Sequence, residues 1–272
     1  IAQIEGGVEY EVLRDDKALE YIDYLNLTKV LEILAEFFDV NSCAIAKDGM
    51  LCASALGSSV EDAYQKVVDN NPLSIVGSTV GFSKEVTLEV AKQLKSMDVR
   101  NLIAPKLSNE ALKYLLEMTE MNVIQVKSPL QEVLGFNADD IKVTPFGYLV
   151  QEQNHSKLTK SSFKVSGKTK PTQQMAEDAI FAWKVAKYTK SNSVVIAKDL
   201  STKAIVQGAS NQVIAAESAL DIACENAKEA VMAVDGEISS EGTLNAAVQN
   251  RIGLIIESGD AEISSKIAKL AD

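Results

Sequence analysis

The chain has a single histidine among its 272 residues, which restricts the catalytic sites it can form. His155 stands in a polar run, between Asn154 and Ser156. A Ser-His-Asp triad or a histidine-rich metal centre would have to use this one imidazole. Loops often carry function, but a loop histidine with polar neighbours is more often a solvated side chain.

Cysteine is also scarce. The three cysteines, Cys43, Cys52 and Cys224, show no CxxC spacing. We therefore predict no disulfide framework and no metal site. Free thiols are typical of a reducing compartment, and the cytoplasm is the simplest location that agrees with them.

Long apolar runs and excess positive charge are missing as well. No apolar run approaches the roughly 20 residues that span a bilayer, and no secretion signal is visible. The net charge is −11, which repels a phosphate backbone. A small group of lysines over 184–198 is typical of a solvated helix face. The composition predicts a globular protein with no membrane partner and no nucleic-acid partner.

An internal repeat is the most informative feature that is present. The octapeptide NSCAIAKD at Asn41–Asp48 returns as NSVVIAKD at Asn192–Asp199, 151 residues later. Gly57 and Gly208 keep the same offset. Shared register beyond the octapeptide favours duplication over chance.

The surroundings of the octapeptide repeat too. Apolar residues at helical spacing precede each copy, and a further helical stretch follows, at Val60–Val68 and Val213–Ala227. Strand-like runs come next, with further strands after them: Leu73–Val80, Ile103–Pro105, Val123–Val126, Ala230–Val234 and Ile252–Glu257. Alternation of this kind predicts an α/β fold of two similar three-layer α/β/α lobes with mixed sheets.

The predicted organisation is a first lobe over residues 1–127, a connecting segment over 128–170 and a second lobe over 171–272. The connecting segment is rich in Pro, Gly and polar residues. Within it, Val143–Gln151 and Ser162–Ser166 are predicted to form strands.

Several short sequence segments, here called phrases, resemble the AICAR transformylase part of the bifunctional purine-synthesis enzyme and occur in the same order. The most specific is EDAIFAWKVAKYTKSN at Glu177–Asn192. Weaker phrases are Asn71–Val80, Ile103–Pro105, Gly147–Gln151, Lys170–Thr172 and Ala197–Asp199. Together they cover nearly the whole chain from about Tyr21 onward. No counterpart of the separate cyclohydrolase part is visible.

The resemblance implies two cytidine-deaminase-like lobes and a homodimer whose active sites lie at the subunit interface. It also implies a reaction in which 10-formyltetrahydrofolate, as cosubstrate, gives a formyl group to the amine of AICAR. That reaction needs a proton acceptor for the amine and a donor for the developing oxyanion.

The family's catalytic Lys-His pair falls on Lys47 and Asp48. An imidazole that titrates near neutrality is thus replaced by a carboxylate that normally ionises near pH 4. Asn192 is retained. Lys47, Asp48 and Asn192 are the residual catalytic candidates, although Lys47 could also repeat a structural lysine, Lys198.

Substrate-binding positions have changed as well. The resemblance places Arg14, Ser74 and Gln212 there, and Gln212 stands where the family has an anion-binding arginine. Three other phrases have diverged: Leu13–Asp16 (LRDD), Asp235–Ser240 (DGEISS) and Ile255–Ala261 (IIESGDA). Phe181 and Trp183, at helical spacing, are more often packing residues than ligand contacts.

Three functions agree with these residues to different degrees. The first is a non-catalytic or diverged transformylase homologue that binds either a purine-pathway metabolite, such as AICAR or a folate, or another protein. The second is an active formyltransferase with a rearranged site, in which a buried aspartate accepts the proton. The third, a deaminase-type zinc enzyme, lacks the Cys and His ligands that it requires.

Overall fold

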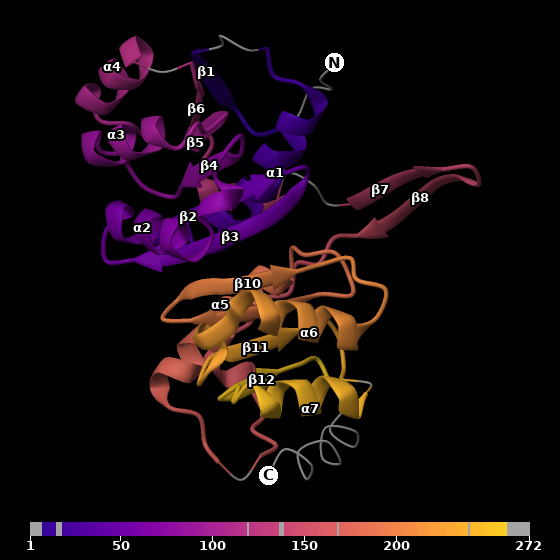
Figure 1. The fold of residues 1–272 in the computed structure, drawn as a ribbon. Coiled ribbons are helices and arrows are strands. Elements are labelled where there is room, and N and C mark those ends of the chain that lie inside the picture. Colours follow the sequence, from indigo (N-terminus) through magenta and orange to yellow (C-terminus); the bar gives the residue numbers. More distant parts are fainter. Residues whose placement is uncertain are drawn as a thin grey trace.

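A computed structural model describes residues 7–14, 18–118, 120–135, 139–167, 169–238 and 240–259. In these residues ten strands pair into one mixed sheet, in the order β1-β6-β5-β4-β2-β3-β10-β9-β11-β12 (Figure 1). Two further strands, β7 and β8, pair only with each other. The prediction of an α/β fold with a mixed sheet is confirmed.

The described part of the first half supplies six strands of the large sheet and four helices. They are β1 (Tyr10–Arg14), α1 (Tyr21–Glu36), β2 (Asn41–Lys47), β3 (Met50–Gly57), α2 (Val60–Asn70), β4 (Thr79–Phe82), α3 (Leu88–Ser96), β5 (Asn101–Ala104), α4 (Asn109–Met118) and β6 (Asn122–Val126).

Within the described ranges, the second half supplies the other four strands and three helices. They are α5 (Gln173–Ala186), β9 (Val194–Lys198), β10 (Ser201–Val206), α6 (Gln212–Ala223), β11 (Val231–Val234), α7 (Glu241–Gln249) and β12 (Leu254–Ile256).

Strand pairing follows the same order in both halves. A hairpin, β2–β3 or β9–β10, pairs antiparallel with the next strand, β4 or β11. The strand after that, β5 or β12, is parallel to its neighbour. The halves share one sheet because β3 and β10 pair antiparallel, with Ser201 opposite Ala55. This pairing removes two strand edges that would otherwise be exposed.

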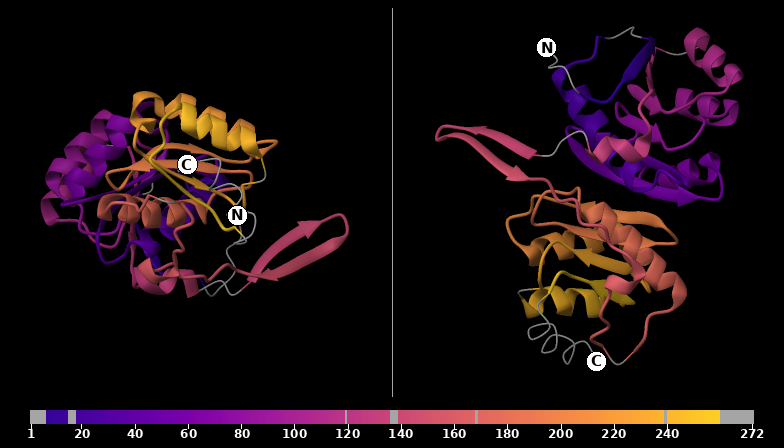
Figure 2. Two further views of the ribbon diagram at one scale, coloured as in Figure 1. Left: turned by 90° about the horizontal axis from the view of Figure 1, so that it is seen from below. Right: turned by 180° about the vertical axis from the view of Figure 1, so that it is seen from behind.

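Helices cover both faces of the sheet (Figure 2). One core lies under α1 and α5 and extends across both halves. On the opposite face, α2, α3 and α4 cover the first half, and α6 and α7 cover the second. Alternate strand residues divide between the faces, as the pleat requires: Cys43 and Ile45 face α2, and Ala44 and Ala46 face α1.

Several helices begin directly after a polar residue whose side chain caps the helix N-terminus. The side chains of Ser59, Thr87, Thr172 and Asn211 each accept a hydrogen bond from the backbone three residues on. These caps set the starts of α2, α3, α5 and α6. α2 extends two residues past the predicted end at Val68, whereas α6 ends at Ala223 and continues as a 3₁₀ turn over Cys224–Ala227.

Three predicted strands differ from the structure. The single strand expected over Val143–Gln151 contains a turn, which separates the strands Asp139–Thr144 and Gly147–Glu152. Leu73–Val80 was expected to be one strand, but Pro72–Ser74 forms a 3₁₀ turn and β4 begins only at Thr79. Pro72 starts the turn, and Gly77 has a φ of 70°, which interrupts extended backbone. The segment Ser162–Ser166 contains no strand either, because its residues find no pairing partner among those described.

The connecting segment contains a projecting hairpin. β7 (Asp139–Thr144) and β8 (Gly147–Glu152) extend away from the two halves as an arm (Figures 1 and 2). Short 3₁₀ turns at Leu130–Gly135 and Lys160–Ser162 flank it.

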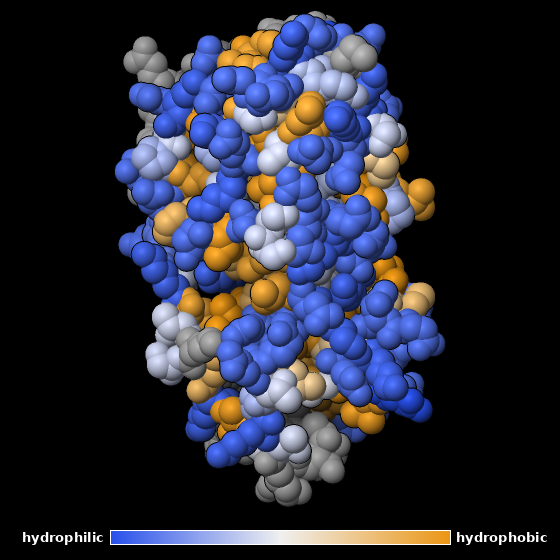
Figure 3. All heavy atoms as spheres, turned by 90° about the vertical axis from the view of Figure 1, so that its left-hand side faces the viewer, coloured by the Kyte–Doolittle hydropathy of each residue, from blue (hydrophilic) through white to orange (hydrophobic). Residues whose placement is uncertain are grey.

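Polar side chains cover most of the face drawn in Figure 3, with apolar side chains between them. None of the helices in the described ranges has both the length and the apolar character needed to cross a membrane. Cys43, Cys52 and Cys224 are all free thiols.

Candidate functional site

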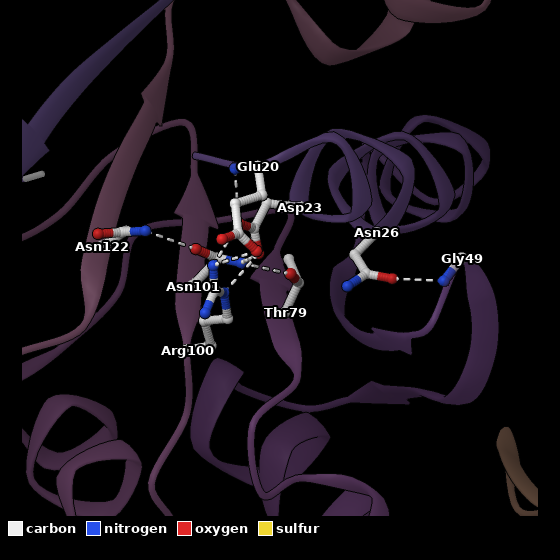
Figure 4. Close-up of polar contacts among 8 residues, drawn as sticks. All are labelled: Glu20, Asp23, Asn26, Gly49, Thr79, Arg100, Asn101 and Asn122. Carbon is white, nitrogen blue, oxygen red and sulfur yellow. Dashed lines mark hydrogen bonds and ion pairs between the residues drawn. The ribbon is translucent and has the colours of Figure 1, made fainter. Parts of the chain in front are cut away.

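Lys47 and Asp48 lie at the turn between β2 and β3. Asp48 and Gly49 have φ values of 53° and 75°, the left-handed pair that two-residue hairpins favour. The backbone N–H of Gly49 donates to Asn26 Oδ1 over 2.7 Å (Figure 4), which attaches the turn to α1. Lys47 Nζ donates to the carbonyl of Val76 over 2.9 Å. The lysine is therefore held at the edge of the sheet.

Asn192 lies at the same edge, just before β9. Its Nδ2 donates to Ala209 O over 3.1 Å, and Ala209 N donates back to Asn192 O. Gln207, at the end of β10, donates to Leu51 O over 2.9 Å and connects this edge of the second half to that of the first. Lys47 and Asn192 thus come from strand ends that meet at one edge.

Each of these two contacts has a counterpart in the other half of the chain. Lys198 Nζ donates to Lys228 O over 2.8 Å, as Lys47 does to Val76. Asn41 Nδ2 donates to Ser58 O over 3.0 Å, as Asn192 does to Ala209. These contacts therefore do not distinguish Lys47 and Asn192 from their counterparts in the other half.

Ser74 and Gln212 lie along the same edge. Ser74 closes the 3₁₀ turn two residues before Val76, the partner of Lys47. Gln212 is buried in the first turn of α6, where its Nε2 donates to Glu237 O over 2.9 Å. Thr243 Oγ1 donates to Gln212 Oε1 over 3.3 Å. These two hydrogen bonds hold the side-chain amide of Gln212 against residues of the second half of the chain.

Arg14 is not brought close to the other candidates within one chain. It ends β1, and β6, β5 and β4 lie between β1 and β2. Four strand spacings correspond to roughly 19 Å. The guanidinium of Arg14 donates to the carbonyls of Leu115 and Leu116 at the end of α4. Of the diverged phrases, Asp15, Asp16, Ser239, Asp260 and Ala261 lie outside the described residues.

A buried polar network lies further along this edge (Figure 4), and the sequence analysis missed it. Asp23, in the first turn of α1, is fully buried. Arg100 donates to both its carboxylate oxygens over 2.7 and 2.8 Å, and Asn101 Nδ2 donates over 2.8 Å. Asn101 also donates to Thr79 Oγ1 and accepts from Asn122, each over 2.9 Å.

The network joins α1 to the starts of β4, β5 and β6. Burial opposes ionisation of Asp23, but hydrogen bonds from Arg100, the Glu20 backbone and Asn101 outweigh it and lower the pKa of the carboxyl. The charge of Asp23 is thus matched inside the protein. A single Asp among apolar helix positions was the only signal of this network in the sequence.

The most specific phrase of the resemblance serves packing. Phe181 is buried, and its ring centroid lies 5.4 Å from that of Phe37 at the end of α1. Lys187 Nζ and Tyr188 Oη each donate to Glu36 Oε1 over 2.8 Å. Trp183 packs against the same core. The phrase therefore fastens α5 to α1, across the junction of the two halves.

His155 is exposed in the segment after β8. The carbonyl of its neighbour Ser156 accepts from Lys187 Nζ over 3.3 Å. This places the imidazole near the end of α5, whereas Lys47 lies at the β2–β3 turn.

A cavity of about 220 Å³ lies elsewhere, between α1, β1 and the 3₁₀ turn after β6. Its lining includes Tyr10 and Tyr24, whose hydroxyls are 3.1 Å apart, and the apolar side chains Leu31 and Val133. None of the predicted site residues lines it.

Comparison with known proteins gives the family. Residues 3–222 match the family described as AICARFT/IMPCHase bienzyme. The chain belongs to this family. The resemblance inferred from the phrases is therefore confirmed.

Relatives named "Bifunctional purine biosynthesis protein PurH" match over most of the chain. That of Caldicellulosiruptor bescii is 35% identical over 243 residues, 89% of this chain and 46% of the relative. That of Aquifex aeolicus is 33% identical over 257 residues, 93% of this chain and 49% of the relative. The Fusobacterium nucleatum relative is 35% identical over 89% of this chain and 47% of its own length. The chain spans about half the length of these relatives.

Proposed function

We propose that this family member is a diverged, non-catalytic homologue of the AICAR transformylase that binds AICAR, or a related purine nucleotide, and a folate. The ligands would bind at the sheet edge that holds Lys47, Ser74 and Asn192. A role in purine biosynthesis and a cytoplasmic location belong to the same proposal.

One observation carries this proposal: the side-chain contacts of Lys47 and Asn192 are repeated by Lys198 and Asn41. A lysine whose bond recurs in the other half has a structural reason to be retained without catalysis. The loss of the family's histidine at Asp48 supports the same conclusion, because His155 is the only imidazole and is exposed beyond β8.

The repeated order of strands supports two duplicated cytidine-deaminase-like lobes as the architecture. Residues 1–127 would form the first lobe and 171–272 the second, with 128–170 as the connecting segment. The matching hairpins β2–β3 and β9–β10 would be the equivalent parts.

We also propose a homodimer, and the arm supports it. On one face of the arm, Ile141 pairs with Val150 and Val143 pairs with Tyr148. These four side chains are 59–78% exposed. An isolated two-stranded hairpin is marginally stable in water, so a second copy of the chain covering this face would stabilise it.

An enzyme assay tests the proposal that the protein is non-catalytic. We expect no formyl transfer when AICAR and 10-formyltetrahydrofolate are supplied together, and calorimetric binding of at least one of the two. Lys198→Ala is the matched control for Lys47→Ala, because both remove a lysine with the same backbone contact. Turnover that disappears in Lys47→Ala and persists in Lys198→Ala would contradict the proposal.

An active formyltransferase with a rearranged site is the second candidate. The observation that favours it is the position of Lys47, Asp48 and Asn192 at one edge of the sheet. There Asp48, which is exposed and not buried as expected, would accept the proton of the attacking amine. Loss of turnover in Asp48→Asn, with AICAR binding unchanged, would support this candidate.

A further inference from the structure

Lys203 occupies an unusual place in the sheet. Along the β9–β10 hairpin, Thr202 pairs with Ala197 and Ala204 pairs with Ile196, so Lys203 is an extra residue in β10. Such bulges redirect a side chain and are frequent beside functional sites. The β2–β3 hairpin has a bulge at the matching position, which Cys52 occupies. The second half thus presents an amine where the first presents a thiol.

Polar groups from both halves converge on this lysine. Lys203 Nζ donates to Asn70 Oδ1, at the end of α2, over 3.2 Å. Asn70 Nδ2 donates to Ser201 Oγ over 2.8 Å. Ser201 is 1% exposed, and among the described residues its hydroxyl hydrogen has no acceptor. Asn70 therefore bridges a buried hydroxyl and an ammonium group, both of which can donate further.

Two other lysines act on Lys203. Its burial lowers the pKa of the amine, and the charges of Lys66 and Lys198 lower it further, while Asp199 and Asp178 act in the opposite direction. Lys66 lies on α2 one helical turn before Asn70, so the two side chains share one face of the helix. Its Nζ donates to Leu56 O over 2.9 Å.

Two of the carboxylates nearby already have other partners. Asp178 accepts the backbone N–H groups of Asp199 and Leu200 over 3.1 and 2.7 Å. Asp62 lies 3.6 Å from Lys66. The hydrogen bond of Lys203 itself goes to a neutral amide, so among the described residues its positive charge has no carboxylate at hydrogen-bond distance.

We propose that Lys203, Lys66 and Ser201 form a binding site for a small oxyanion, either a phosphate or a carboxylate group. Two ammonium groups and a hydroxyl supply the charge-assisted donors that such oxygens require. A bound oxyanion would also offset the repulsion between the lysines. The proposed site contains none of Lys47, Ser74 and Asn192, and the proposal does not depend on transformylase activity.

Titration calorimetry of the full chain with inorganic phosphate, and separately with acetate, tests the proposal. We expect at least one anion to bind, and Lys203→Met to weaken binding about tenfold or more, as loss of a charge-assisted hydrogen bond requires. Lys203→Arg should retain most of the affinity. Lys113→Met, which removes an exposed lysine on α4, is the matched control and should change nothing.

Amine labelling gives a second readout that does not depend on the heat of binding. Phosphate or acetate should slow the acylation of Lys203 and leave the acylation rate of Lys113 unchanged. Mass spectrometry measures both rates. The proposal is overturned if neither anion binds, or if Lys203→Met and Lys66→Met, once shown to be folded, bind as wild type. A preference for phosphate over acetate, or the reverse, identifies which group the site takes.

Discussion

Asn26 and Asp178 hold two hairpin turns in the same way, one in each half of the chain. Asn26 Oδ1 accepts the N–H of Gly49, and Asp178 Oδ1 accepts the N–H of Leu200, both over 2.7 Å. Each residue lies on the helix that precedes its hairpin. In both halves, therefore, a helix side chain fixes the turn that carries a Lys-Asp pair.

The first prediction concerns these two side chains. We expect Asn26→Ala and Asp178→Ala each to lower the free energy of unfolding by about 1–3 kcal/mol, because each leaves a turn N–H without its acceptor. Asp178→Ala should cost more, since Asp178 also accepts the N–H of Asp199. Urea denaturation measures the change. Gln65→Ala, on the exposed side of α2, should be close to neutral, and equal losses in all three variants would contradict the assignment.

The second prediction concerns pH and Asp23. Its pKa in the folded protein is below the ordinary value of 3.8, so the unfolded chain takes up its proton first as the pH falls. The stability from ionised Asp23 is therefore complete above about pH 5 and is lost as the pH falls through the folded pKa. Arg100→Met should remove about 3 kcal/mol at neutral pH, because it leaves a buried carboxylate without its ion pair.

Acid unfolding, monitored by circular dichroism, tests this role of Arg100. In Arg100→Met the pKa of Asp23 should rise, and the dependence of stability on pH between about 2 and 4 should weaken. Lys106→Met, which removes an exposed ion pair with Glu85, is the control and should leave the acid transition unchanged. An unaltered transition in Arg100→Met would show that the network does not hold the charge of Asp23.

The repeat in the sequence predicted much of this fold, for a physical reason. The octapeptides lie in β2 and β9, two strands that are buried on both faces of the sheet. Such strands have continuous apolar runs in the sequence, so the repeated runs correspond closely to the observed strands. The boundaries of Leu73–Val80 could not be predicted, because composition alone does not show where Pro72 and Gly77 stop extended backbone. The pairing of β3 with β10 joins two strands that are far apart in the sequence. Local hydrophobic periodicity carries no information about such a pairing.

The site was predictable only in part. The phrases selected Lys47, Ser74, Asn192 and Gln212 as candidates, and the structure brings these residues to one sheet edge because they stand at or just beyond strand ends. Arg14 was grouped with them, yet its strand is at the far end of the sheet. The roles of Asp23 and Lys203 could not be predicted, because both depend on partners that only the tertiary fold brings close.

The third prediction concerns the arm. We expect Val143→Glu with Tyr148→Glu to convert a dimer into monomers, because the two substitutions place charge on its apolar face. Leu149→Glu is the matched control, since Leu149 is also exposed but pairs with Lys142 on the opposite face. Sedimentation velocity gives the oligomeric state. A wild-type chain that is monomeric at high concentration, or an equal effect of the control, would contradict the proposed dimer face.

The last prediction concerns Tyr188 and Glu36 at the junction of the halves. Burial raises the pKa of the Tyr188 hydroxyl, and the neighbouring charge of Glu36 and its hydrogen bond raise it further. A group with a raised folded pKa contributes stability that is complete below its unfolded value, near 10, and is lost as the pH rises through the folded value. Tyr188 should thus favour unfolding only in strong alkali.

Tyr188→Phe should therefore have two opposite effects. At neutral pH it removes the hydrogen bond to Glu36 and costs about 1 kcal/mol. Above pH 10 it removes a group that must lose its proton on unfolding, so the difference from wild type should shrink as the pH rises. Urea denaturation at pH 7 and pH 11 measures both. Tyr148→Phe, on the exposed arm, should show neither effect, and a constant difference for Tyr188→Phe would mean that its hydroxyl ionises equally in the folded and unfolded chain.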